Sequence, residues 1–84
     1  MKTIEQKIEQ LNAEVGGIYP DTMNQLRIIL GYSHLAHNHP TIDSYFDKLC
    51  EHLALLGQLA RNHGQKRLSQ FVQVILSNLC GSYS

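Results

Sequence analysis

The chain has 84 residues, 43% of them hydrophobic, and its seven basic residues balance seven acidic ones. A chain of this length forms one small domain that needs its apolar faces for a single core, which leaves little room for a separate catalytic domain. The zero net charge argues against a strongly basic nucleic-acid-binding protein and against an acidic mimic.

The charges are unevenly distributed along the chain. Residues 1–52 hold seven acids and four bases, a net charge of −3, whereas residues 53–84 hold three bases and no acid, a net charge of +3. The three bases of the second half are Arg61, Lys66 and Arg67.

No run of residues reaches the roughly eighteen apolar positions of a membrane helix, and the segment MKTIEQKIEQLN lacks the apolar core of a signal peptide. We therefore expect a soluble protein in the cytoplasm. Cys50 and Cys80 are the only cysteines. A cytoplasmic chain is expected to keep both as thiols, and the alternative is a disulfide between them.

The first two helices are predicted over residues 3–15 and 21–38. In the first, Thr3 and Gln6 have the spacing of a capping box, and apolar residues form a narrow stripe that ends at two glycines. In the second, Asp21 is expected to cap the start and Pro40 to force the end. Beside its main apolar face, this helix has a second apolar stripe formed by Ile28, Tyr32 and Leu35. Either a neighbouring helix or a partner would cover this stripe.

The third and fourth helices are predicted over residues 41–62 and 66–80. Thr41 is expected to cap the third helix, whose long apolar face includes Leu53 and Gly57. We interpret Gly57 as a point of close packing with another helix. Since no stretch alternates with the period of a strand and the connections are short, the sequence predicts an all-α protein, a single-domain antiparallel up-and-down four-helix bundle.

The segment HLAHNHP concentrates three of the five histidines, His34, His37 and His39. They are the candidates for a metal site, because two of them are spaced i, i+3 on one predicted helix. The alternatives are a pH switch, for which His37 and His52 are the candidates, and a solvated helix end where histidine suits the helix dipole. We favour the helix end and expect no metal and no cofactor.

No arrangement of a nucleophile, a base and an orienting group can be recognised, and phosphate-binding and dinucleotide-binding glycine motifs are absent from the sequence. We expect a protein that is not an enzyme. The segment ARNHGQKRLSQF places three basic residues around a turn, but its spacing departs from a helix-turn-helix. A DNA-binding regulator is the third hypothesis, and no nucleic-acid partner is expected.

From residue 21 to residue 80 the layout resembles a known family. A helix leading into NHP, the long segment IDSYFDKLCEHLALLGQLA, a short basic connection and LSQFVQVILSNL are similar to the immunity proteins that protect lactic acid bacteria from pediocin-like (class IIa) bacteriocins, of the enterocin A immunity type. The resemblance implies an antiparallel four-helix bundle without catalytic activity. It also implies protection from inside the cell at the mannose phosphotransferase permease, with specificity in the C-terminal half.

The leading hypothesis is therefore an immunity protein that contacts a membrane receptor–bacteriocin complex at the inner membrane face through Arg61, Lys66, Arg67 and Tyr83. The alternative is a helical adaptor or chaperone that self-associates, as a homodimer for example, or binds a partner helix through Ile28, Tyr32 and Leu35.

Overall fold

The structure is a computed structural model that describes residues 4–15 and 19–79, with only the backbone described for residues 4, 5 and 7. The described chain forms four helices, α1 (Ile4–Val15), α2 (Pro20–Asn38), α3 (Asp43–Asn62) and α4 (Lys66–Leu79). The predicted number and order of the helices are confirmed, and the predicted ends lie within two residues of the observed ones.

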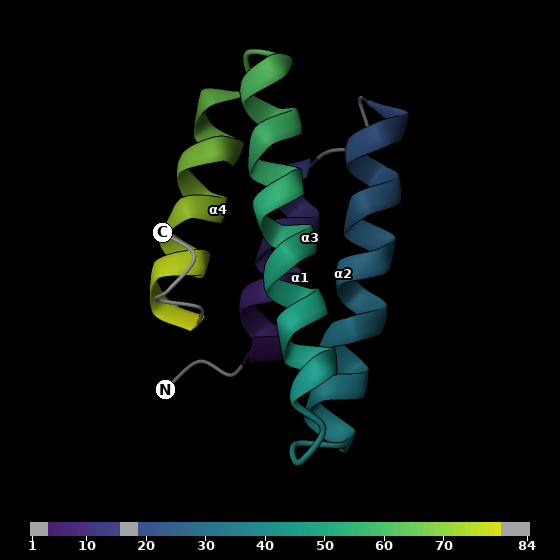
Figure 1. Ribbon diagram of the computed structural model, residues 1–84. Helices are drawn as coiled ribbons and strands as arrows, with labels where there is room; N and C mark the ends of the chain where they lie inside the picture. The colour runs from purple at the N-terminus through teal and green to yellow at the C-terminus, as the bar shows by residue number, and fades with distance from the viewer. Residues whose placement is uncertain (1–3, 16–18, 80–84) are drawn as a thin grey trace.

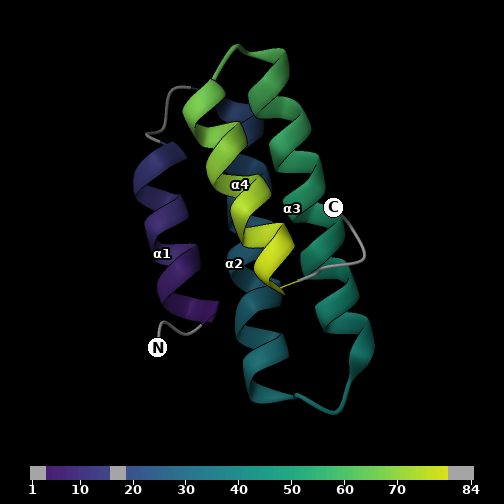
Figure 2. The same ribbon diagram turned by 90° about the vertical axis from the view of Figure 1, so that its left-hand side faces the viewer.

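The helices run alternately up and down (Figures 1 and 2). The end of α1, the start of α2 and the α3–α4 connection lie at one end of the molecule, and the α2–α3 connection lies at the other. α1 packs against α2 and α4, and α3 packs against the same two helices, so the four helices close a ring around one core. The molecule measures 36 × 24 × 22 Å. It is the up-and-down bundle that the helical periodicity and short connections predict.

The core lies along the axis of this ring, and all four helices contribute to it. α3 contributes the most residues because it is buried on an arc wide enough to meet both α2 and α4. Gly57 lies on this arc, where a Cβ atom would come within 3.3 Å of Val72 Cγ1 of α4, so the glycine does permit the close approach of two helices. The buried apolar residues are Ile8, Leu11, Val15, Leu26, Ile29, Leu49, Cys50, Leu53, Leu56, Ala60, Leu68, Val72, Ile75 and Leu76.

Two of the predicted helix caps are wrong. α2 begins one residue early, at Pro20, because proline suits the first turn of a helix; Tyr19 is the N-cap, and Asp21 instead accepts a hydrogen bond from the Thr22 backbone N–H at 2.8 Å. α3 begins at Asp43, two residues later than expected. Thr41 lies in the turn after Pro40, and the N-cap is Ile42, which provides no capping hydrogen bond from its side chain.

Cys50 corrects a further expectation. It is fully buried and disulfide-bonded, so it is not the thiol that a cytoplasmic chain would hold. The chain's other cysteine, Cys80, lies outside the described residues.

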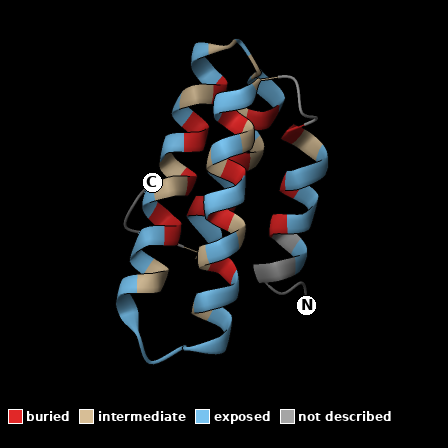
Figure 3. Ribbon diagram, turned by 90° about the vertical axis from the view of Figure 1, so that its right-hand side faces the viewer, coloured by how far each residue is buried: buried red, intermediate tan, exposed pale blue. Residues whose placement is uncertain are grey.

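The end of the bundle at the α2–α3 connection is a two-helix projection. α2 and α3 have 19 and 20 residues, about 28 and 30 Å, whereas α1 and α4 have 12 and 14, about 18 and 21 Å. Figure 3 shows that the buried residues stop short of this end, and none of residues 34–48 is buried. We call residues 34–48 the tip. Because the shorter helices leave the tip uncovered, Ile42 is exposed and Phe46 is half-buried, although both continue the apolar face of α3.

Ser33 is the one buried residue whose hydroxyl has no hydrogen-bond partner among the described residues. Since an unpaired buried hydroxyl loses its hydration without compensation, Ser33→Ala should raise the free energy of unfolding by about 1 kcal/mol. The matched control is Thr22→Val, which removes a satisfied hydroxyl that donates to the Tyr19 carbonyl at 2.8 Å and should destabilise the protein. Urea unfolding measures both effects, and a destabilising Ser33→Ala would contradict the prediction.

Candidate functional site

The connection between α3 and α4 forms a tight basic turn. Gly64 adopts a φ of +73°, a left-handed conformation that suits glycine, and lets the chain reverse between Asn62 and Lys66. The Gln65 backbone N–H donates to the Ala60 carbonyl at 2.8 Å, which closes the end of α3. The geometry of this turn therefore fixes where the first residue of α4, Lys66, lies relative to the last turn of α3.

A surface hollow of about 400 Å³ lies against this turn. Its lining combines two cations with small and amide-bearing side chains, a composition that suits hydrogen bonding to an anionic or carbonyl-rich surface. The lining residues, which we call the basic corner, are Arg61, Gly64, Lys66, Ser69 and Gln70.

The two cations of the basic corner are available to a partner. The Arg61 Nη2 atom donates to Gln58 Oε1 at 3.0 Å, a neutral contact one helical turn away. Among the described residues, no acidic side chain forms an ion pair with Arg61. Lys66 is exposed and forms no ion pair within the part of the chain that the structure describes. The corner therefore presents two positive charges on a rigid turn.

Arg67 was predicted to belong to the same site, but the structure places it elsewhere. Its Nε atom lies 3.2 Å from Glu14 Oε2, so Arg67 connects α4 to α1, and it does not line the hollow. Tyr83, the fourth predicted contact residue of the basic half, lies outside the described residues.

A cluster that the sequence did not predict ties the basic corner to the start of α2. The ring of His63 stacks on Tyr19, with centroids 3.9 Å apart and planes at 7°, and its Nε2 atom lies 2.9 and 3.0 Å from the two carboxylate oxygens of Asp21. Because a carboxylate only accepts hydrogen bonds, Nε2 is the protonated nitrogen. This His63 cluster fixes the start of α2 relative to the α3–α4 connection.

The hydrogen bond from His63 lowers the pKa of the Asp21 carboxyl below its ordinary value of 3.8. Since the carboxyl binds its proton less tightly in the folded state than in the unfolded state, it stabilises the fold above about pH 4, and this contribution is lost as the pH falls through the folded-state pKa. Asp21→Ala should therefore lower the urea midpoint at pH 6, and this effect should shrink progressively as the pH falls below about 4.

The matched control for this pH prediction is His63→Ala, a background in which Asp21→Ala should change the urea midpoint little, because the two side chains act as one pair. Equal effects of Asp21→Ala with and without His63, or an effect independent of pH, would contradict it.

The stripe formed by Ile28, Tyr32 and Leu35 is only partly covered. Tyr32 is half-buried and its ring stacks on His52 of α3, with centroids 5.7 Å apart, while His52 Nδ1 lies 2.8 Å from Gln25 Oε1. Ile28 and Leu35 remain 38% and 37% exposed. The neighbouring helix thus covers the middle of the stripe and leaves both ends to solvent.

The histidines of HLAHNHP lie at the exposed end of α2, where His34 and His37 are helical and His39 is the C-cap residue. The His39 ring lies 5.9 Å from that of Tyr45, tilted by 58°. Among residues 4–15 and 19–79, no three histidine, cysteine or acidic side chains group closely enough to hold a metal ion.

Comparison of the chain with known proteins finds no family model, no curated protein and no solved structure that matches it. Among the described helices, none has both the length and the apolar character needed to cross a membrane.

The His63 cluster could not have been found from local sequence signals. Asp21 and His63 are 42 positions apart, and each has an ordinary local interpretation, as a helix start and a helix stop. The topology is the only available signal, because an up-and-down bundle brings its first and third connections to the same end.

Proposed function

We propose that this protein is a binding protein of the bacteriocin immunity type, which protects a cell by contacting a membrane receptor–bacteriocin complex from the cytoplasmic side through the basic corner. The observation that supports this most directly is that two cations, Arg61 and Lys66, line one hollow and form no ion pair with any residue that the structure describes. The antiparallel four-helix architecture agrees with what the resemblance implies.

The arrangement suits binding for a physical reason. A rigid, hydrogen-bonded turn holds its cations without the loss of conformational entropy that a flexible loop would suffer on binding. Two exposed cations that face a complementary acidic patch would orient the partner and raise the association rate. The His63 cluster supports this role, since it restrains the turn from the side of α2.

The test is a protection assay in a sensitive lactic acid bacterium that expresses the chain and is challenged with a panel of pediocin-like bacteriocins. We expect survival against one member of the panel, and loss of that survival in the double variant Arg61→Gln, Lys66→Gln. The matched control is Arg67→Gln, which removes the same kind of charge from α4 outside the hollow and should retain protection. Uniform killing with folded protein present in the cells would overturn the proposal.

The disulfide of Cys50 weighs against a reducing compartment, where such bonds are rare. Complete burial of Cys50 shields the bond from attack by thiols in the folded state, which is the condition under which it would persist in the cytoplasm. Alkylation of thiols in intact cells, before lysis, shows whether Cys50 is oxidised there. If Cys50 is fully reduced in cells that survive the bacteriocin, protection does not require the disulfide.

A second candidate function, a self-associating or helix-binding adaptor, is favoured by the exposed ends of the stripe. Sedimentation velocity tests it: Ile28→Lys with Leu35→Lys should dissolve any dimer, because the charges would be buried at the interface. The matched control is Val74→Lys, at an apolar position of α4 that is 59% exposed. A monomer at all accessible concentrations would contradict self-association.

A further inference from the structure

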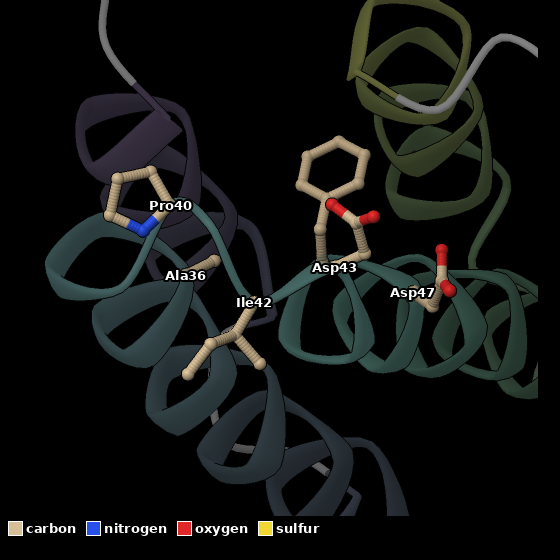
Figure 4. Close-up of a pocket in the computed structure, with 6 residues that line it drawn as sticks. Ala36, Pro40, Ile42, Asp43 and Asp47 are labelled. Atoms are coloured by element: carbon tan, nitrogen blue, oxygen red, sulfur yellow. The ribbon is translucent and has the colours of Figure 1, made fainter.

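The tip carries a second surface, at the opposite end of the bundle from the basic corner. A hollow of about 430 Å³ lies between the last turns of α2 and the first turns of α3. It is lined by four apolar residues and two acids: Ala36, Pro40, Ile42, Phe46, Asp43 and Asp47. In Figure 4, Asp43 and Asp47 lie along α3 on one side, and Ala36, Pro40 and Ile42 lie on the other.

The apolar part of this surface exists because the bundle is incomplete here. Along most of their length α2 and α3 are covered by α1 and α4, but none of residues 34–48 is buried. Ile42 is 40% exposed and Phe46 half-buried, so two large apolar side chains remain in partial contact with water. A further helical segment laid across the tip would bury them as α1 and α4 bury the core.

The charges of the hollow define the partner. Asp43 and Asp47 are one helical turn apart, both are exposed, and neither forms an ion pair within residues 4–15 and 19–79. The hollow has no basic lining residue. The nearby base on the same helix, Lys48, lies 3.3 Å from Glu51 and is thereby partly compensated.

We propose that the tip docks a helical segment of a partner protein that carries lysine or arginine beside large apolar side chains. The apolar side chains would enter between Ile42 and Phe46, and the bases would meet Asp43 and Asp47. Such a segment completes the bundle and matches the charges at the same time, as amphipathic helices do when they bind in grooves. The inference is independent of the basic corner, which has the opposite charge and lies at the other end.

The test uses the full chain and a fluorescent helical peptide of about 18 residues with leucine on one face and lysine on the other. Fluorescence anisotropy at low salt should show saturable binding that weakens as salt is added. A second peptide with glutamate in place of lysine should bind at least tenfold more weakly, because its charges repel those of the tip.

Four variants, two of them controls, test whether the peptide binds in the hollow. The double variant Asp43→Asn, Asp47→Asn should weaken binding about tenfold. Ile42→Ser should weaken binding by a similar factor without disturbing folding, because the Ile42 side chain is already exposed. The matched control is Glu9→Gln, an exposed acid of α1 outside the hollow, which should leave binding unchanged. The double variant Arg61→Gln, Lys66→Gln should also bind the peptide normally. Failure of peptide binding at the tip can therefore be distinguished from failure of the protection proposed for the basic corner.

Several outcomes would overturn the proposal. These are absence of saturable binding, equal weakening by Glu9→Gln, and equal binding of the glutamate peptide. The chain could also self-associate and lose this self-association in the Asp43→Asn, Asp47→Asn double variant. In that case the occupant of the hollow would be a second copy of the chain. The peptide could also bind a chain shortened by residues 81–84 but fail to bind the full chain. In that case residues 81–84 themselves would be the occupant of the hollow.

Discussion

Leu53→Ala is expected to lower the free energy of unfolding by about 2 to 5 kcal/mol, since it removes the side chain of a fully buried residue on the most buried helix and leaves a cavity. A domain of this size has a total stability of roughly 4 to 13 kcal/mol. The substitution therefore removes a large share of that stability, and part of the population should be unfolded near physiological temperature.

The matched control for Leu53→Ala lies two positions further along the same helix. Leu55 is 48% exposed, so Leu55→Ala makes the same chemical change on the solvent side and should alter stability by less than about 0.5 kcal/mol. Urea unfolding followed by circular dichroism measures both variants. Equal effects of the two substitutions would contradict the orientation of α3.

Reduction of the disulfide at Cys50 is expected to lower the free energy of unfolding by about 2 to 4 kcal/mol, because the unfolded chain is then no longer restrained by the cross-link. Since Cys50 is fully buried, the bond should be reduced slowly in the folded protein and quickly in urea, where the sulfur becomes accessible to thiols. Unfolding curves with and without a phosphine reductant measure the first effect, and the time course of thiol release measures the second.

The control for the disulfide prediction is Cys50→Ala, in which the reductant should have no further effect on stability. Thiol titration of the denatured, unreduced protein should detect no free thiol at Cys50, and peptide mapping identifies the residue to which it is joined. A titratable Cys50 thiol, or unfolding curves that the reductant does not shift, would contradict the disulfide.

The order and approximate length of the helices follow from the sequence by itself. The apolar spacing of three and four residues is set within each helix, and proline and glycine act on their immediate neighbours, so both signals are local. The same spacing places Leu53 and Gly57 on the inner face of α3, where the structure finds them buried. The charge asymmetry that directs attention to Arg61 and Lys66 is likewise a property of the sequence.

Local signals fail where two of them compete or where a helix has more than one neighbour. Asp21 and Thr41 are both good capping residues, but the positions of Pro20 and Pro40 decide where α2 and α3 begin. Cys50 lies beside the main apolar stripe of α3 and is buried because α3 meets two helices, which widens its buried arc.

Only the tertiary structure decides which distant residues meet. His63 reaches Asp21 and Tyr19, and Arg67 reaches Glu14 instead of the hollow beside it, because the packing of whole helices sets these distances. The tip also depends on the assembled bundle, since Ile42 and Phe46 continue the apolar stripe of α3 but are not buried there. Periodicity identifies the face of a helix that can be buried, and the lengths of its neighbours determine how much of that face is covered.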